Sequence, residues 1–315
     1  MALGRIFAIR IAMGLIVAWA VLTLVFAMFT LTEDWVLQAE LGILRFGGAD
    51  EELLDMVQQQ YFDARGLDAP LWEVYIDWMG NLLLLNWGDS FVTGEPARQL
   101  VFESLIRTGM YVLPAFVMAV VLGVGIGLVE ALYPAHRLPR AVIIAGYLAF
   151  ALPMFWVASI VVSVPLFTDE IYEPTWFHRH GLPIALVTAS LLGSYLSYAR
   201  AHSLEYVRTD FIKLVRAKGA SQRLIGRHVL RNAAIPFFSM LFTEVILLLL
   251  LAVFVLEAVL GIDGFGLLIL EATQERDLPV LLGSLMVVIA IGVSANILQD
   301  ISYSYFDPRV DTGTR

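Results

Sequence analysis

The sequence predicts an all-α polytopic membrane protein with six transmembrane helices. Hydrophobic residues make up 59% of its 315 residues and charged residues only 16%, and the mean hydropathy is +0.78. Soluble domains carry roughly 45–50% apolar and about 25% charged residues. Six charge-poor stretches are long enough to cross a bilayer, which takes roughly 20 helical residues. They are continuously apolar rather than alternating, so helices rather than strands are predicted.

The first predicted span follows Arg5 and Arg10, as the apolar core of a signal peptide would. Its 21 charge-free residues exceed the usual apolar core of about 7–15, and no Ala-x-Ala cleavage signal follows, so we interpret it as a retained span. Glu244 is the one charge within the fifth span. In order, the spans are Ile11 to Leu31, Thr108 to Val129, Ala141 to Thr168, Gly181 to Ala199, Asn232 to Leu256 and Leu278 to Gln299.

The distribution of basic residues predicts the orientation. With the N-terminus inside, fourteen Lys and Arg residues fall on the inner side and six on the outer side. Cytoplasmic segments hold such an excess, so both termini are expected in the cytoplasm. Acidic residues show the opposite bias, because fourteen of the 29 lie between Glu33 and Glu103.

We divide the chain into three parts at the first span and at the end of a long outer segment. Residues 1–31 form the cytoplasmic N-terminus and first span, and residues 108–315 form a membrane core with the other five spans. Residues 32–107 are expected outside the membrane as a helical segment, because loops beyond about 12–15 residues usually have a function. Glu51 to Tyr61 and Leu71 to Leu85 are its predicted helices.

Composition excludes several functions. A net charge of -9 argues against nucleic acid as a partner, since phosphates need a basic surface. The absence of cysteine removes disulfides, thiolate metal sites and a Cys nucleophile. The two lysines, Lys213 and Lys218, do not follow a glycine, so the chain has no P-loop of its own.

A cytoplasmic loop at residues 200–235 holds eight of the twenty basic residues. Arg223, Arg227 and Arg231 recur every four residues on one helical face, and Gly219 is placed to end a preceding helix. The pattern predicts a short helix, a glycine turn and a second basic helix. It fits an anchor on anionic lipid headgroups or a docking site for a cytoplasmic protein, and the pattern alone leaves both open.

The residues of this loop resemble the EAA-type loop of ABC-importer permeases, in the version of the dipeptide/oligopeptide/nickel permease family. The matching positions are Tyr206 to Thr209, Arg216 to Gly219, Arg227, His228, Arg231, Asn232 and Pro236. Other segments resemble the family in the right order, from about residue 66 onward: LDAPLWEVYIDWMGNLL, GDSFVTGEP, LGVGIG, ALPMFW, LEAVLGIDGFG and a final FDPR. TLTEDWV at Thr30 stands where the family usually has a Pro-Gly-Asp segment.

The resemblance implies an ABC type I importer permease fold in the cell (plasma or inner) membrane. Such a chain is a non-catalytic subunit that moves solute by alternating access. Its implied partners are a second homologous permease subunit, two cytoplasmic ABC ATPase subunits, an extracytoplasmic solute-binding protein and the lipid bilayer. No cofactor is expected in this chain, because ATP and Mg²⁺ are bound by the ATPase subunits. Di- or oligopeptides are the expected solute, with nickel or a small oligosaccharide as the alternative.

Within this family the basic loop carries the contact with the ATPase. The residues expected to dock there are Arg208, Thr209, Arg216, Ala217, Lys218, Gly219 and Ser221. The acidic outer segment is the expected platform for the solute-binding protein. Its charge is also typical of a solvated face adapted to high salt, and the two interpretations are compatible.

Other residues are candidates for the translocation path or a gate. Glu244 lies within a span, where a charge costs about 3 kcal/mol and usually faces a cavity or partner; the alternative is a protonated carboxyl with no solute contact. Glu257 and Asp263 lie beside glycines that mark either a turn or an external gate. Pro153 lies inside the third span, where proline tends to kink a helix.

Two further patterns have structural explanations. Gly123 and Gly127 have the small-xxx-small spacing that lets helices pack closely. His178 and His180 form a His-x-His pair, but a metal site needs at least one more ligand, so none is predicted.

Two rival classes remain at this stage. A stand-alone secondary transporter or channel leaves the basic loop unexplained and lacks the expected inverted repeats. An intramembrane enzyme needs paired catalytic residues within the spans, where Glu244 is alone.

Overall fold

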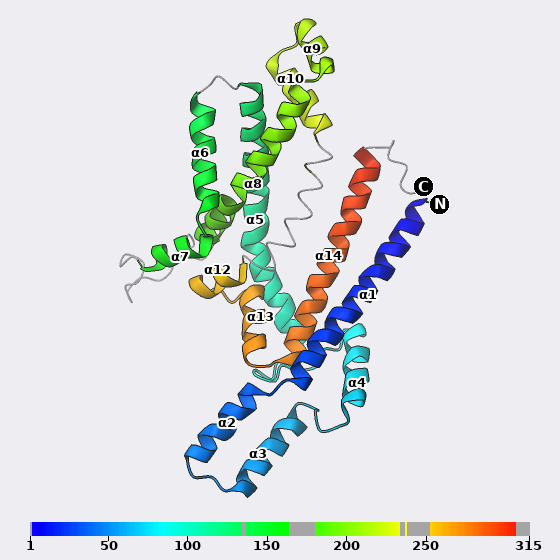
Figure 1. Ribbon diagram of the computed structural model, residues 1–315, viewed down its shortest axis with the longest axis vertical. Helices are drawn as coiled ribbons and strands as arrows, with labels where there is room; N and C mark the ends of the chain where they lie inside the picture. The colour runs from blue at the N-terminus through cyan, green and yellow to red at the C-terminus, as the bar shows by residue number, and fades with distance from the viewer. Residues whose placement is uncertain (1, 134–136, 164–179, 234–236, 238–252, 307–315) are drawn as a thin grey trace. The chain divides into compact units, whose positions relative to one another are not determined.

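The computed structural model describes residues 2–133, 137–163, 180–233, 237 and 253–306 (Figure 1). Most of the described residues are helical, and the extended pairing among them is one isolated bridge between Asp89 and Pro96. By internal contacts the chain forms two compact units. We call Ile6–Ile106 with Asp263–Val293 the α1–α4 unit. We call Arg107–Ile262, with Met1–Arg5 and Ser294–Arg315, the hairpin unit.

Four predicted spans each match one helix, except that Gly181, the first residue of the fourth, is the N-cap of its helix. These helices are α1 (Ala2–Leu31), α5 (Ala97–Leu132), α8 (Leu182–Val207) and α14 (Leu278–Phe306). Each of the four helices contains a stretch long and apolar enough to cross a membrane. Two pairs of shorter helices are bent, and if each pair is taken as one span, the described residues hold six spans. Pro114 lies inside α5 without ending it.

The third predicted span is a bent pair. Helix α6 (Arg137–Ala151) and helix α7 (Met154–Ser163) meet at an angle of 84°. Pro153 lies in the break, where its carbonyl accepts from the amides of Trp156 and Val157 at 3.0 and 3.2 Å. Since proline cannot donate an amide hydrogen bond, the helix restarts after it. Thr168 at the end of this predicted span lies outside the described residues.

The fifth predicted span lies largely outside the described residues, because residues 238–252 belong to that part of the chain. Its last residues enter α12 (Val253–Leu260). Helix α12 and helix α13 (Phe265–Gln274) together form the second bent pair.

The outer segment contains three helices before α5. Helix α3 (Glu51–Ala64) extends the first predicted helix, and α4 (Leu71–Leu83) ends two residues before the predicted end. The chain turns there, because Leu85 has a left-handed φ of 58°. Helix α2 (Trp35–Phe46) was not predicted. Its start is set by Asp34, whose carboxylate accepts from the amides of Val36 and Leu37, as an N-cap does.

The α1–α4 unit is built around one apolar core with a satellite. The core joins α1, α4, the start of α5, α13 and the first part of α14; among its buried members are Leu22, Phe26, Val74, Leu82, Trp87, Val101, Phe265 and Leu282. The satellite packs α2 on α3 through Leu37, Leu41, Leu54 and Tyr61.

The hairpin unit also has more than one apolar cluster. The larger one joins α5, α7, α8 and α12, and includes Tyr111, Met154, Val187, Tyr195 and Leu256. A smaller one lies under two short helices, α9 (Asp210–Ala217) and α10 (Gln222–Asn232).

Candidate functional site

The basic loop folds into two short helices, which we call the basic hairpin (residues 208–232). Arg208 caps the end of α8, and Thr209 precedes α9, with its hydroxyl donating to the Tyr206 carbonyl at 2.7 Å. Asp210 begins α9, where a negative charge favours the helix N-terminus, and forms a 2.8 Å ion pair with Lys213. The hydrogen bond from Lys213 and its charge lower the pKa of Asp210.

Gly219 forms the turn of the basic hairpin. Its φ is +81°, in the left-handed region that glycine adopts without penalty. A Cβ there would meet no atom within 4 Å, so within this chain glycine serves the backbone conformation rather than close packing. Ser221 then caps α10 by accepting from the amide of Leu224 at 3.4 Å.

The hairpin presents the predicted docking residues to the outside. Thr209 is half-buried, and the other six are exposed: Arg208, Arg216, Ala217, Lys218, Gly219 and Ser221. Two apolar side chains on α9 are exposed beside them, Phe211 at 49% and Leu214 at 56%. Sequence reasoning did not assign these two to the site, although large apolar side chains in a basic loop are the available signal for a protein contact.

An apolar cluster fixes the hairpin on the helices behind it. Ile212 of α9 and Ile225 and Val229 of α10 are buried, and they pack with Leu128 and Leu132 of α5. Partly buried Tyr206 and Val207, at the end of α8, join the same cluster. The hairpin is therefore attached to α5 by packing as well as to α8 by the chain itself.

Close packing joins α5 to α8 below the hairpin. A Cβ on Gly123 would lie 2.5 Å from the Tyr195 Cβ, and one on Gly127 would lie 2.8 Å from the backbone of Leu196 and Arg200. Real Cβ atoms essentially never come so close, so both positions need glycine. The prediction of close helix packing at Gly123 and Gly127 is confirmed, and the helix that packs against them is α8.

An ion pair lies at the same junction. The Arg200 Nε is 2.5 Å from Oε2 of Glu130, and their side chains are 44% and 11% exposed. This pair could not be predicted from the sequence, because Glu130 and Arg200 are in different helices, α5 and α8. Together with the glycine contacts it links the ends of α5 and α8 where the hairpin begins.

The candidate gate residues have different surroundings. Glu257 on α12 is fully buried, and its Oε1 accepts from the Thr108 hydroxyl at 2.6 Å and the Tyr111 hydroxyl at 2.7 Å, both on α5. Asp263 and Pro153 are exposed. Glu244 lies outside the described residues, as does His178 of the His-x-His pair. The described contacts therefore make Glu257 a tie between α12 and α5.

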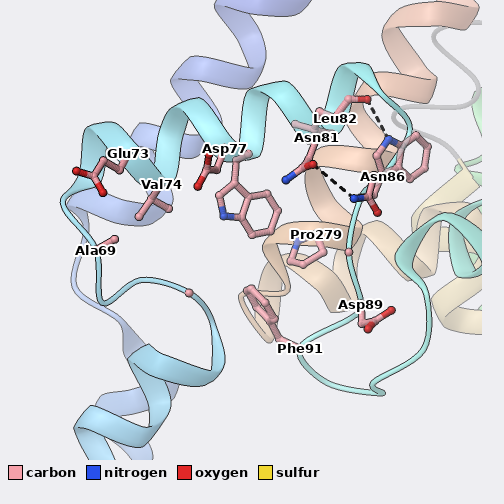
Figure 2. Close-up of a pocket in the computed structure, with 14 residues that line it drawn as sticks. Ala69, Glu73, Val74, Asp77, Asn81, Leu82, Asn86, Asp89, Phe91 and Pro279 are labelled. Carbon is pink, nitrogen blue, oxygen red and sulfur yellow. Dashed lines mark hydrogen bonds between the residues drawn. The ribbon is translucent and has the colours of Figure 1, made fainter.

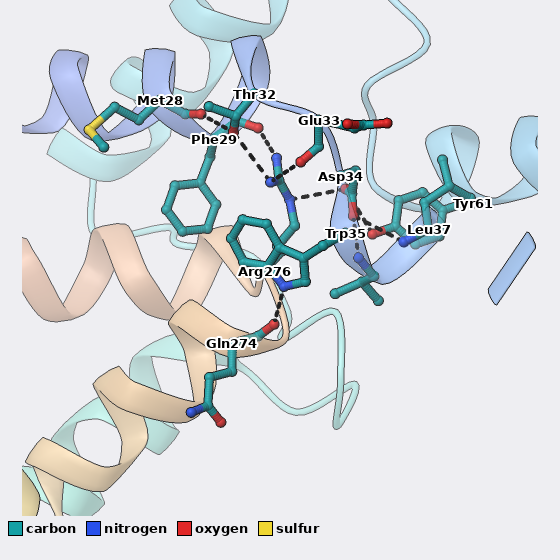
Figure 3. A network of polar contacts seen from close by, with 11 residues as sticks. Met28, Phe29, Thr32, Glu33, Asp34, Trp35, Leu37, Tyr61, Gln274 and Arg276 are labelled. Carbon is teal, nitrogen blue, oxygen red and sulfur yellow. Dashed lines mark hydrogen bonds and ion pairs between the residues drawn. The ribbon is translucent and has the colours of Figure 1, made fainter. Parts of the chain in front are cut away.

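The turn between α13 and α14 carries a second polar site, centred on Arg276 (Figure 3). Its guanidinium pairs with Asp34 at 3.1 Å and donates to the carbonyls of Glu33, at 3.1 Å, and Phe29. It also lies over the ring of Trp35, 4.6 Å from the centroid. Arg276 thus satisfies carbonyls at the end of α1, which a helix leaves without internal partners, and fixes the start of α2.

Asp277, the next residue, holds a different loop. It is 3% exposed and accepts from the Ser90 hydroxyl and from the amide of Phe91 at 3.2 Å. Two consecutive buried charges in one turn therefore hold the start of the outer segment and its loop at residues 90–91. Sequence reasoning missed this site, since it counted Arg276 only as one outer basic residue.

Beside this turn lies a surface cavity of about 330 Å³, which we call the acidic cavity (Figure 2). Glu73, Asp77 and Asn81 line it from one stripe of α4, and Asp89 lines it from the following loop. Trp78 and Phe91 form apolar walls, with 6.1 Å between ring centroids. None of its lining residues is basic, so the cavity is suited to a cationic group.

Metal binding has no support within the described part of the chain, where no three His, Cys, Asp or Glu side chains are grouped to hold an ion.

The geometry defines a class of protein. Several apolar helices long enough to cross a membrane carry an exposed basic hairpin that is firmly packed on two of them. That is the architecture of a polytopic membrane protein with a basic hairpin fixed to its helices.

The comparison with known families identifies the chain more closely. Residues 119–312 match the model described as binding-protein-dependent transport system inner membrane component, and the chain belongs to this family. It is therefore a membrane-embedded permease subunit of an ATP-driven ABC importer with the type I fold, and it is not itself an enzyme. Such a subunit works with ATPase and substrate-binding partners.

Two curated relatives cover most of the chain. The oligopeptide transport system permease protein AppB of Bacillus subtilis is 25% identical over 278 residues, which are 83% of this chain and 87% of the relative. The metal-staphylopine import system permease protein CntB of Staphylococcus aureus is 28% identical over 267 residues, 84% of each chain.

Proposed function

We propose that this permease subunit carries di- or oligopeptides into the cytoplasm. The proposal rests on its similarity to a permease named for oligopeptide transport over 83% of the chain. In this arrangement the chain pairs with a second homologous permease subunit, two ATPase subunits bind ATP and Mg²⁺, and a solute-binding protein delivers the peptide. The excess of inner basic residues favours cytoplasmic termini.

The basic hairpin is the proposed ATPase contact. Its exposed Arg216 and Lys218 can reach acidic or carbonyl groups on the ATPase, while Phe211 and Leu214 offer apolar area. Closure of the ATPase dimer then moves the hairpin. Because the hairpin packs on α5 and continues from α8, the movement reaches both helices and biases two packings of the spans.

The outer segment is the proposed docking platform for the solute-binding protein. The acidic cavity supports this role because three carboxylates and two aromatic walls suit a Lys or Arg side chain on that partner. Arg276 and Asp277 support it by fixing the cavity's surroundings before any partner arrives.

A metal chelate is the second candidate solute. The observation that favours it is the 28% identity to CntB, which is named for metal-staphylopine import. The same class of importer with nickel or a small oligosaccharide as its solute is the other alternative, since the solute-binding protein selects the solute in such systems.

Native purification tests these proposals together. The chain is purified from its own membrane, its companions are identified by mass spectrometry, and the ligand retained by the solute-binding protein is extracted. We expect a second permease, ATPase subunits, a solute-binding protein and a bound peptide. A bound metal chelate would replace the peptide proposal while leaving the importer intact. Recovery as a lone active homo-oligomer would contradict the proposed assembly.

A further inference from the structure

Helix α4 has three distinct faces. Val74, Trp78 and Leu82 turn toward the unit's apolar core, and Glu73, Asp77 and Asn81 line the acidic cavity. The third face is apolar yet open: Trp72 is 64% exposed, Ile76 58% and Leu83 70%. At 3.6 residues per turn these three lie within one narrow stripe. An exposed apolar stripe of this kind marks a contact with a membrane or with another protein.

The position of α4 along α1 is fixed by two contacts of Tyr75. The Tyr75 hydroxyl lies 2.7 Å from the Thr23 hydroxyl, and the Tyr75 ring meets that of Phe26 edge-on with 5.4 Å between centroids. Thr23 lies eight residues inside the charge-free run that ends at Leu31. At 1.5 Å per residue this is about 12 Å along the helix. Helix α4 therefore lies beside the part of α1 that is built to be in the bilayer.

A groove of about 310 Å³ runs between the two helices. It carries no charged side chain, and its lining is Thr23, Phe26, Ala27, Thr30, Leu31, Leu71, Trp72 and Tyr75. Leu31 is 74% exposed and borders Met28, which is 55% exposed, so the apolar surface of α1 continues through the groove onto α4. This continuity and neutrality favour a hydrocarbon occupant.

We propose that α4 is an interfacial helix: Trp72, Ile76 and Leu83 contact the acyl chains of the leaflet in which α1 ends, and the groove holds one acyl chain. The acidic stripe of the same helix then faces water, as the charged side of an interfacial helix does, with Trp72 at the boundary. The acidic cavity is thereby held at the membrane surface. The proposal requires α1 to span the bilayer and is independent of which solute is carried.

The test uses single-cysteine labelling: this chain holds no cysteine, and any cysteine of the partner subunits is first replaced by serine. Ile76→Cys and the adjacent Asp77→Cys are each introduced in the assembled importer, reconstituted in lipid nanodiscs, and labelled with a nitroxide. Collision with oxygen, which concentrates in lipid, is compared with collision with a water-soluble nickel chelate. Both side chains are exposed, so they form a matched pair that differs in face.

We expect the oxygen-to-nickel ratio at Ile76 to be several-fold higher than at Asp77. Equal access of the nickel chelate to both positions would overturn the proposal, because the stripe would then lie in water. Shielding of Ile76 from both reagents would also overturn it, since a protein partner would cover the stripe.

A second measurement keeps the test independent of the cysteine variants. Brominated lipids quench tryptophan fluorescence on contact, and Trp72→Phe removes the proposed lipid-facing indole. The quenched fraction is expected to fall in the variant relative to wild type. An unchanged fraction would contradict the lipid contact whatever the transport activity shows.

Discussion

The Arg276 guanidinium and the Asp34 carboxylate form an ion pair with 3.1 Å between Nε and Oδ2, and their side chains are only 6% and 15% exposed. The pair joins the turn before α14 to the start of α2. Arg276 holds this position with a φ of 54°, a conformation that costs a non-glycine residue about 1–2 kcal/mol. Its contacts must outweigh that strain.

Arg276→Ala is expected to destabilise the outer segment by about 3–5 kcal/mol, because it leaves a poorly solvated carboxylate without its partner. Arg276→Gly relieves the backbone strain and is expected to lose about 1 kcal/mol less. Thermal unfolding of the reconstituted protein measures both. Lys213→Ala is the control, since its pair with Asp210 is exposed and should contribute little. A control as damaging as Arg276→Ala would contradict the assignment.

Tyr61 makes the same site sensitive to alkaline pH. Burial raises the pKa of Tyr61 well above 10, and the hydrogen bond its hydroxyl donates to Asp34 at 2.9 Å raises it further. The folded state thus holds the proton more tightly than the unfolded state. Stability from this group is complete below about pH 10 and falls as the pH rises further.

Tyr61→Phe should therefore flatten the loss of stability above about pH 10, while lowering stability at neutral pH by about 1.5–3 kcal/mol through the lost charged hydrogen bond. Melting temperatures of wild type and variant across pH 8 to 11 provide the measurement. Parallel curves for the two proteins would show that Tyr61 is not the group responsible.

Gly127 is the sharpest test of the α5–α8 contact. Its Cβ would lie 2.8 Å from backbone atoms of α8, so Gly127→Ala must separate the helices, at about 1–3 kcal/mol. Gly125 on the same helix has nothing within 4 Å, and Gly125→Ala should be neutral or slightly stabilising. Thermal unfolding distinguishes them, and equal melting temperatures would be inconsistent with this packing.

Gly219 tests the docking role of the basic hairpin. Asp and Asn both tolerate the left-handed backbone, so Gly219→Asp and Gly219→Asn differ mainly in charge. Gly219→Asp places a negative charge between cations proposed to meet acidic groups of the ATPase. We expect it to abolish ATP-driven uptake while the subunit stays inserted, and Gly219→Asn to retain substantial uptake. Normal uptake by Gly219→Asp would refute the docking role.

Glu257 distinguishes a structural tie from a charge on the translocation path. Glu257→Ala removes the acceptor shared by two buried hydroxyls and should cost about 1–3 kcal/mol for each. Glu257→Gln keeps an acceptor oxygen, so it should preserve both stability and uptake. Loss of uptake by a stable Glu257→Gln protein would assign the charge to transport instead. Melting temperature and uptake measured on the same preparations separate the outcomes.

Local sequence patterns were enough to predict the class of the protein. Its apolar stretches predicted a helical membrane protein, and the pattern around Gly219 predicted two helices with a glycine turn, because hydrophobic length and backbone preference act locally. The small-xxx-small spacing of Gly123 and Gly127 likewise predicted a close helix contact, but it did not predict that the partner helix is α8.

The pairing of residues far apart in the chain could not be predicted and depends on how the helices pack. Arg276 with Asp34, Arg200 with Glu130 and Glu257 with Tyr111 join different helices, and no local periodicity encodes such pairs. The acidic composition of residues 32–107 predicted a docking platform outside the membrane. The contact of Tyr75 with Thr23 places one of its helices, α4, beside the apolar length of α1. The sequence of a helix specifies which of its faces are apolar and which are polar. Which face becomes buried depends on the elements that pack against the helix.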